Sequence, residues 1–343
     1  MATSGQTAAT ALAPFRIEPE FVGRVWGFQD LRPWYDRVAE GGMPIGEVWL
    51  TGDECLVATG PYVGQSLSAL FAMEAKALLG ARAPSLESPL LLKVIFAKEK
   101  LSVQVHPDDK LAQKYGQPRG KTECWYALAA DAGSQVAAGL KPGVTVDQVK
   151  EGIHAGTLEE SLNMLPVAAG EMIFVDAGTV HAIWPGSILL ETQQNCDLTY
   201  RMYDYGRGRE LHIEKSLEAM RLETRAGRVQ PTVIADRTIL LDSEYFRVER
   251  VSVQGSLTDA GLRGDGATGE ARAGLAYLFA ATGSGRISPQ SGGPDFEPVD
   301  LPERGIVAIP AACPAFTLGN ADGLELIRIT PNLPSQAQSG EAR

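Results

Sequence analysis

Short runs of apolar residues, broken by glycine and proline, recur along the chain and predict a protein built mainly of β-strands. Residues 88–97, SPLLLKVIFA, are almost wholly apolar, which is typical of a strand buried on both faces. Residues 101–107, LSVQVHP, alternate instead, so one strand face is apolar and the other carries polar groups. Further strand patterns occupy 46–60, 170–183, 187–206 and four segments between 245 and 330.

Helical spacing of apolar residues appears at three places. In residues 66–82 it predicts a helix with Ser66 as its N-cap and Gly80 at its C-terminal end. Between 141 and 169, Thr145 with Gln148 and Thr157 with Glu160 each have capping-box spacing, which predicts a small helical insertion. Residues 212–223 predict a connecting helix with three apolar positions on one face.

No regular alternation of strands and helices is present, which favours antiparallel sandwiches or barrels over a doubly wound parallel sheet. We expect a disordered N-terminus at 1–14, a catalytic domain at 15–225 that contains the helical insertion, and a second β domain at 233–343. Polar residues near 224–232 are typical of a linker, and the glycine-rich segment 255–274 is expected to be a mobile surface loop.

Composition and charge exclude several classes of protein. The 343 residues are 44% hydrophobic and 21% charged, as in ordinary globular proteins, and the net charge of −11 without a basic block argues against nucleic-acid binding. Four scattered cysteines without a C-x-x-C pair indicate neither a zinc ribbon nor a disulfide framework, and favour a reducing, cytoplasmic location. No signal peptide pattern or run of 18 apolar residues is present, so we expect no membrane association.

The polar face of the 101–107 strand raises the possibility of a metal site. Gln104 and His106 share that face, Glu123 follows Lys121 by two residues in GKTECWYAL, and His181 follows a glycine turn. Two imidazoles, a carboxylate and an amide suit zinc or a similar divalent ion, and a single anionic ligand would leave the ion a strong Lewis acid. A lone buried histidine is more often hydrogen-bonded structure than a ligand, so only the set indicates a metal.

The spacing G-x7-G-x2-H from 170 to 181 resembles the second motif of cupins, with Asp176 where proline is usual. LSVQVHPDD, GKTECWY, GTVHAI and LLETQQNCDLTYRMYDYGR together resemble type I mannose-6-phosphate isomerases of the short bacterial form, over most of 20–220. This resemblance implies cupin-type jelly-roll β-barrels and one zinc ion per chain, held at the matching positions Gln104, His106, Glu123 and His181. It also implies reversible isomerisation of mannose 6-phosphate and fructose 6-phosphate through a cis-enediol.

The family's catalytic residues match Lys121, Glu191 and Arg201. Glu191 is our first choice for the base, with water on the metal as the alternative, because burial moves a carboxyl pKa toward neutrality. Lys93 and Arg207 join Lys121 and Arg201 as candidates to bind the phosphate group. The sequence alone leaves two rival functions, a cupin oxygenase that uses iron and a non-catalytic sugar-phosphate-binding module, and the C-terminal domain is expected to be a degenerate, structural cupin.

Overall fold

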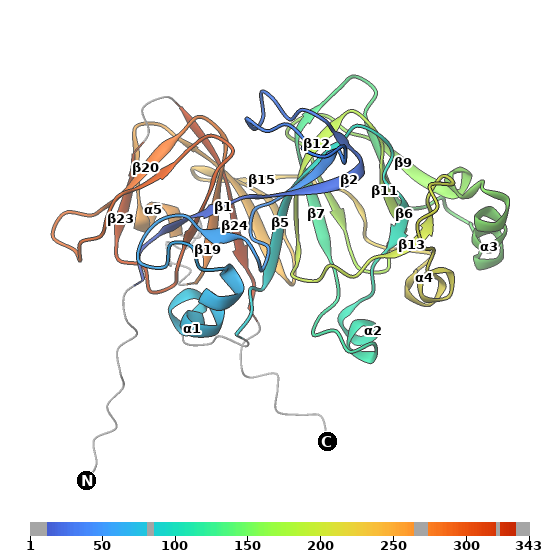
Figure 1. The fold of residues 1–343 in the computed structure, drawn as a ribbon, viewed down its shortest axis with the longest axis horizontal. Helices are drawn as coiled ribbons and strands as arrows, with labels where there is room; N and C mark the ends of the chain where they lie inside the picture. The colour runs from blue at the N-terminus through green and yellow to red at the C-terminus, as the bar shows by residue number, and fades with distance from the viewer. Residues whose placement is uncertain (1–11, 81–85, 264–273, 320–322, 334–343) are drawn as a thin grey trace, which may run out of the picture. The chain divides into compact units, whose positions relative to one another are not determined.

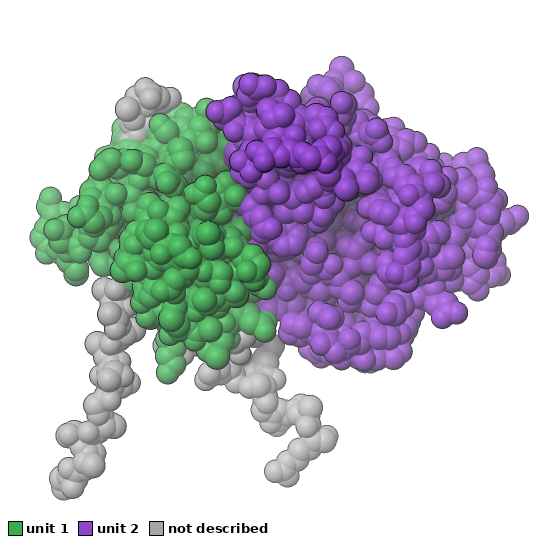
Figure 2. Space-filling model, in the orientation of Figure 1, with its two compact units in different colours: residues 1–19, 53–88, 231–343 green, residues 20–52, 89–230 purple. Residues whose placement is uncertain are grey.

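In this computed structural model the described residues are 12–80, 86–263, 274–319 and 323–333, and they form two compact units. One unit comprises residues 20–52 and 89–230, and the other comprises 1–19, 53–88 and 231–343 (Figure 2). Each unit contains two β-sheets, and every strand pairing within them is antiparallel, as the sequence pattern predicted (Figure 1). None of the helices in the described residues is long and apolar enough to span a membrane.

Two sheets form the unit of residues 20–52 and 89–230. The seven-stranded sheet has the order β14 (Gly227–Arg228), β10 (Met172–Val175), β7 (Glu123–Ala130), β12 (Ser187–Gln194), β5 (Leu90–Ala97), β3 (Ile45–Trp49) and β2 (Glu20–Phe28). The five-stranded sheet has the order β13 (Tyr200–Tyr203), β6 (Val103–Val105), β11 (His181–Ile183), β8 (Gln135–Leu140) and β9 (Leu162–Pro166). The helices of this unit are α2 (Asp109–Lys114), α3 (Val146–Ala155), the 3-10 helix η1 (Leu158–Ser161) and α4 (Ile213–Ala219).

Two apolar clusters fix the direction in which the strands of the five-stranded sheet point their side chains. One cluster fills the space between the two sheets and includes Trp125 and Ile183. The other combines Val103 and Val105 with residues of α3 and α4, so these helices cover the outer face of the five-stranded sheet (Figure 1). Because strand side chains alternate, Gln104 points toward the space between the sheets.

The other unit also has two sheets, in a mainly β arrangement. The eight-stranded sheet has the order β15 (Thr232–Ile234), β16 (Arg237–Asp242), β17 (Phe246–Val253), β24 (Leu324–Pro331), β19 (Ala276–Thr282), β22 (Ile306–Ile309), β1 (Phe15–Glu18) and β4 (Leu56–Val57). The four-stranded sheet has the order β18 (Ser256–Thr258), β23 (Phe316–Gly319), β20 (Gly285–Pro289) and β21 (Val299–Leu301), and the helices are α1 (Leu67–Leu79) and α5 (Asp259–Arg263).

A buried ionic cluster distinguishes β16, β17 and β24 of this unit. Glu249 is fully buried, and its carboxylate forms ion pairs with Arg328, with Arg247 at 3.0 Å and with Arg237 at 3.8 Å. All three arginines are buried. Since a buried charge is stable only when it is paired, these arginines offset the cost of burying the Glu249 carboxylate.

The boundary between the units differs from the contiguous domains expected from the sequence. Residues 15–19 and 53–88 group with the C-terminal strands, because β1 pairs with β22 and the backbone N–H of Ala311 donates to the Leu78 carbonyl. Most of the expected disordered N-terminus, 1–11, lies outside the described residues, and Leu12 is buried. Local hydrophobic periodicity carries no information about which distant strand a segment joins.

The helix predictions were correct for 66–82 and for the first capping box. Ser66 caps α1, whose C-cap is Gly80, and Thr145 and Gln148 form the reciprocal hydrogen bonds of a capping box on α3. The second capping box was wrong, because Thr157 precedes a 3-10 turn and makes no side-chain cap hydrogen bond. The loop expected at 255–274 was also wrong in its first part, which forms β18 and α5, while 264–273 lies outside the described residues.

Candidate metal centre and active-site pocket

A row of polar side chains crosses the inner face of the five-stranded sheet. His181 on β11 lies directly opposite Gln104 on β6, and Arg201 on β13 lies opposite Gln104 from the other side. A turn delivers His181 to this row, because Gly178 has φ +89° and its N–H donates to the His106 carbonyl at 2.8 Å. A Cβ at this glycine would lie 2.8 Å from the Arg221 side chain, so the turn requires glycine.

Three buried side chains, one directly after β6 and the others on β7 and β11, converge on one point. His106, Glu123 and His181 each place a potential ligand atom within 4.8 Å of the others. Oε2 of Glu123 lies 3.5 Å from Nε2 of His106, and Oε1 of the same carboxylate lies 3.5 Å from Nε2 of His181. Gln104 adjoins them, with its Nε2 3.2 Å from Nε2 of His181, and rotation of this amide directs its Oε1 to the same point. The structure thus brings together His106, Glu123 and His181, three of the four residues that the sequence grouped, and places Gln104 beside them.

The hydrogen bonds of the two histidines show that this cluster suits a cation. Nδ1 of His106 donates to the Leu198 carbonyl and Nδ1 of His181 donates to the Thr179 carbonyl, both at 2.9 Å, so each Nε2 presents a lone pair. Burial lowers the pKa of His106 well below its usual value and the pKa of His181 to about 4, so both rings are neutral at pH 7.

Three buried atoms of the cluster, Nε2 of His106 and both carboxylate oxygens of Glu123, have no hydrogen-bond partner. All of them are electron-pair donors that face one another, and the ammonium group that pairs with Glu123, Nζ of Lys121 at 3.4 Å, leaves them without a hydrogen bond, so a cation at their centre complements them. The donors are two nitrogens and at least one oxygen, which is a set that divalent metals accept. The residues therefore fit a divalent metal ion.

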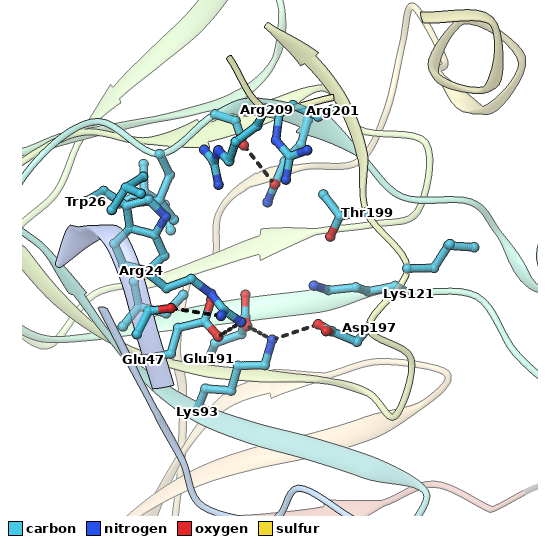
Figure 3. A pocket seen from close by; sticks show the side chains of 18 of the residues that line it. Arg24, Trp26, Glu47, Lys93, Lys121, Glu191, Asp197, Thr199, Arg201 and Arg209 are labelled. Atoms are coloured by element: carbon cyan, nitrogen blue, oxygen red, sulfur yellow. Dashed lines mark hydrogen bonds and ion pairs between the residues drawn. The ribbon is translucent and has the colours of Figure 1, made fainter. Parts of the chain in front are cut away.

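A pocket of about 520 Å³ lies beside the cluster (Figure 3). Gln104, Lys121 and Trp125 line it and also adjoin the metal cluster, since Lys121 Nζ is 3.4 Å from Glu123 and the Trp125 ring packs against His181. The charged residues that line the pocket are Arg24, Glu47, Lys93, Lys121, Glu191, Asp197, Arg201 and Arg209. With five cations and three anions, the pocket suits an anionic ligand despite the acidic composition of the chain.

A buried carboxylate, Glu191, lies in the wall of this pocket. On β12 it pairs in register with Lys93 of β5, and its Oε2 is 3.5 Å from Lys93 Nζ. Its Oε1 accepts a hydrogen bond from Trp125 Nε1 at 3.2 Å. Burial raises the pKa of Glu191 and the charge of Glu123 raises it further, whereas Lys121 and Lys93 oppose this shift. The side chain thus has the environment of a general acid or base.

The cations next to Glu191 are held in place by other carboxylates. Lys93 Nζ is also 3.4 Å from Asp197, and it lies over the Trp49 ring. Glu47 accepts hydrogen bonds from Trp49 Nε1 at 2.7 Å and from Arg24 at 2.9 Å. Burial alone would raise the pKa of Glu47, but Lys93 and Arg24 hold it at about 2. This end of the pocket is therefore a fixed network of paired charges.

The structure brings together most of the residues that the sequence singled out, and it excludes one from the pocket. Lys93, Lys121, Glu191 and Arg201 line the pocket, although Glu191 and Arg201 come from different sheets. Arg207 does not line it, because its Nη1 donates to the Lys100 carbonyl at 2.8 Å and pairs with Asp204 at 3.6 Å.

Sequence reasoning missed several residues of the pocket, among them Trp26, Glu47, Trp125 and Arg209. Trp26 and Glu47 fall within residues 20–220, the range that the family resemblance covers, so that resemblance was a signal that could have found them. Arg209 stands in no motif, and only the structure reveals it.

Comparisons with known proteins agree with this geometry. The model of the phosphomannose isomerase type I catalytic domain matches residues 16–139. Mannose-6-phosphate isomerase from Streptococcus mutans is 34% identical over an alignment of 259 residues that covers 71% of this chain and 80% of that protein, and ManA of Bacillus subtilis is 34% identical over 258 residues with the same coverage. The crystal structure of a Bacillus subtilis mannose 6-phosphate isomerase superposes with a TM-score of 0.80 at 27% identity, over 93% of this chain and 99% of that one. The chain therefore belongs to the type I phosphomannose isomerase family.

Proposed function

We propose that this protein is a zinc-dependent mannose-6-phosphate isomerase, which interconverts mannose 6-phosphate and fructose 6-phosphate by moving a proton between C1 and C2 through a cis-enediol. The observation that carries the proposal is the buried His106, Glu123 and His181 cluster next to a cationic pocket that contains Glu191. Family membership supports the same reaction, because the relatives from Streptococcus mutans and Bacillus subtilis are named mannose-6-phosphate isomerases.

We assign the metal site to Gln104, His106, Glu123 and His181, with one zinc ion per chain. The unpartnered buried atoms of His106 and Glu123 support this assignment, as does the neutral state of both imidazoles. When bound, zinc supplies Lewis-acid polarisation of the sugar oxygens.

Glu191 is the base in this proposal. Its Oε1 is oriented by the Trp125 indole and its Oε2 by Lys93, so the carboxylate has a fixed position in the pocket wall. Its raised pKa reduces the free-energy difference between the carboxylate and the protonated acid, which favours taking a proton from one carbon and returning it to the next.

Lys121 stabilises the negative charge that develops on the sugar oxygens during the reaction. Burial alone would lower the pKa of Lys121, but Glu123 and Glu191 raise it above its usual value, so the ammonium group remains charged. A charge fixed before the reaction starts needs no reorganisation when the oxyanion forms.

We also propose that the protein works in the cytoplasm, with a small phosphosugar as its partner. All four cysteines are free, which agrees with a reducing compartment.

The test is fructose 6-phosphate formation by purified, metal-analysed protein, before and after chelation and after addition of zinc. We expect turnover to disappear with chelation and to return with zinc. Zinc-loaded protein that forms no product would refute the substrate assignment. Activity that survives complete metal removal would refute the zinc-dependent mechanism.

A further inference from the structure

Two arginines, Arg201 and Arg209, lie together at one end of the pocket, away from the network around Glu191 (Figure 3). Thr199 also lines the pocket and lies between these arginines and Lys121 in Figure 3. Arg201 lies two strands from His181 in the row across the sheet, since Gln104 pairs with both. At about 4.8 Å between strands, the Cα atoms of Arg201 and His181 are roughly 10 Å apart.

Arg209 is held in a defined orientation by a buried carboxylate. Its Nε donates to Asp204 Oδ2 at 2.7 Å and its Nη2 donates to the other oxygen, while the Asp204 side chain is only 3% exposed. This bidentate pair uses the Nε and Nη2 edge of the guanidinium, so both N–H groups of Nη1 remain available to a ligand. The Arg209 side chain is 28% exposed, so solvent or a ligand can reach it.

Arg201 beside it is only partly satisfied. Its Nη1 donates to the Glu210 carbonyl at 2.8 Å, whereas its Nε is shielded from solvent and has no hydrogen-bond partner. Burial lowers the pKa of Arg201 and the nearby charge of Arg209 lowers it further. Two adjacent guanidinium groups with unused donors make this end of the pocket suitable for a dianion.

We propose that Arg209 determines specificity for phosphorylated sugars by binding the phosphate group of the substrate, with Arg201 as its neighbour. This inference rests on the proposed function and extends it to the part of the substrate farthest from the reacting carbons. Six bonds of about 1.5 Å separate C2 from phosphorus in a hexose 6-phosphate, which in an extended chain is about 7.5 Å. That length suits a sugar whose reacting end lies at the metal cluster and whose phosphate meets the two arginines.

The opposite end of the pocket is less suitable for phosphate. Lys93 is already paired with Glu191 and Asp197, at 3.5 and 3.4 Å, and Lys121 is paired with Glu123 at 3.4 Å. A dianion placed there would meet three carboxylates, and like charges at short range repel strongly.

The test compares Arg209→Gln with Arg207→Gln, because both arginines pair with Asp204 but only Arg209 lines the pocket. We expect Arg209→Gln to raise KM for mannose 6-phosphate and the inhibition constant of inorganic phosphate together by about 10- to 100-fold, as for loss of a charge-assisted hydrogen bond. Metal content and kcat should change by less than about threefold, because the metal cluster and Glu191 are untouched. Arg286→Gln, which removes one exposed positive charge elsewhere, is the control for net charge.

The double variant Asp204→Asn with Arg209→Gln keeps the test informative if the single variant is unstable, since it leaves no buried carboxylate without a partner. Unchanged KM and phosphate inhibition in the folded variants would overturn the proposal. A larger effect of Arg207→Gln than of Arg209→Gln would also overturn it, in favour of the residue that the sequence suggested.

Calorimetric titration with inorganic phosphate separates this inference from the proposed function. If metal-loaded protein binds phosphate in an Arg209-dependent manner but does not isomerise mannose 6-phosphate, the phosphate site is supported and the proposed reaction is refuted. If the protein isomerises the sugar but Arg209→Gln leaves phosphate binding intact, the reaction is supported and the phosphate site is refuted.

Discussion

Removal of the metal should destabilise the protein by an amount that follows from three buried atoms. Nε2 of His106 and both carboxylate oxygens of Glu123 have no hydrogen-bond partner among the residues that the structure describes. Each orphaned buried group costs about 1–3 kcal/mol, so a bound cation relieves roughly 3–9 kcal/mol, less whatever the ion pair between Lys121 and Glu123 retains. At about 2–4 °C per kcal/mol for a domain of this size, we expect the apo protein to unfold about 6–12 °C lower if about 3 kcal/mol remains after this subtraction.

The assay is thermal unfolding of zinc-loaded, chelated and zinc-restored protein at fixed metal concentration, because stabilisation by a ligand depends on its concentration. Glu123→Gln is the matched variant. It removes the anionic ligand, so its unfolding temperature should no longer respond to chelation. The reasoning would be refuted by equal unfolding temperatures of loaded and metal-free wild type, or by a Glu123→Gln variant that responds as strongly as wild type.

Further predictions concern the base, the histidines and the buried ionic cluster. Glu191→Gln should lower kcat by about 10²- to 10⁴-fold while zinc content stays unchanged by elemental analysis, and a fully active variant would exclude Glu191 as the base. In the metal-free protein, burial lowers the pKa of His181 from 6.5 to about 4, so the folded state binds fewer protons than the unfolded state between these values. His181 alone should therefore lower the stability measured by urea unfolding by about 3 kcal/mol from pH 7 to pH 4, and His106, whose pKa is also lowered by burial, adds to this loss, so a flat profile would contradict the neutral rings. Glu249→Gln should lower the unfolding free energy by about 3–5 kcal/mol, because it removes the only carboxylate in the described part of the chain that pairs with the buried Arg328, whereas Arg237 and Arg247 keep Asp236 and Asp242. Asp300→Asn, in the exposed pair with Arg286, should cost less than about 1 kcal/mol, and equal losses from the two variants would argue against burial as the cause.

Local sequence patterns were reliable where the physical cause is local. The alternation in LSVQVHP fixed the side of the strand on which Gln104 lies, because side chains of a strand must alternate once one face is buried. Ser66 and Gly80 marked the ends of α1 because capping depends on residues within one turn. The capping-box prediction at Thr157 was wrong because a threonine at this position can also precede a 3-10 turn, in which its side chain makes no cap hydrogen bond.

Which distant segments meet depended on the tertiary structure. Glu191 and Arg201 are ten residues apart, and strand parity could not place them together, because they lie on different sheets that line one pocket. The sequence likewise could not show which of Arg207 and Arg209 lines the pocket. Both arginines pair with Asp204, and only the structure shows that the Arg209 side chain faces the pocket.

The sequence by itself therefore determined the mainly β, antiparallel architecture and the residues able to ligate a metal. Strand alternation and side-chain chemistry are properties of short segments, so they can be recognised before the fold is known. The tertiary structure alone decided that the N-terminal strand β1 joins the C-terminal sheet, and that Arg209 lies in the pocket. Both outcomes depend on strand pairing and side-chain contacts between segments far apart in the chain, which no local pattern encodes.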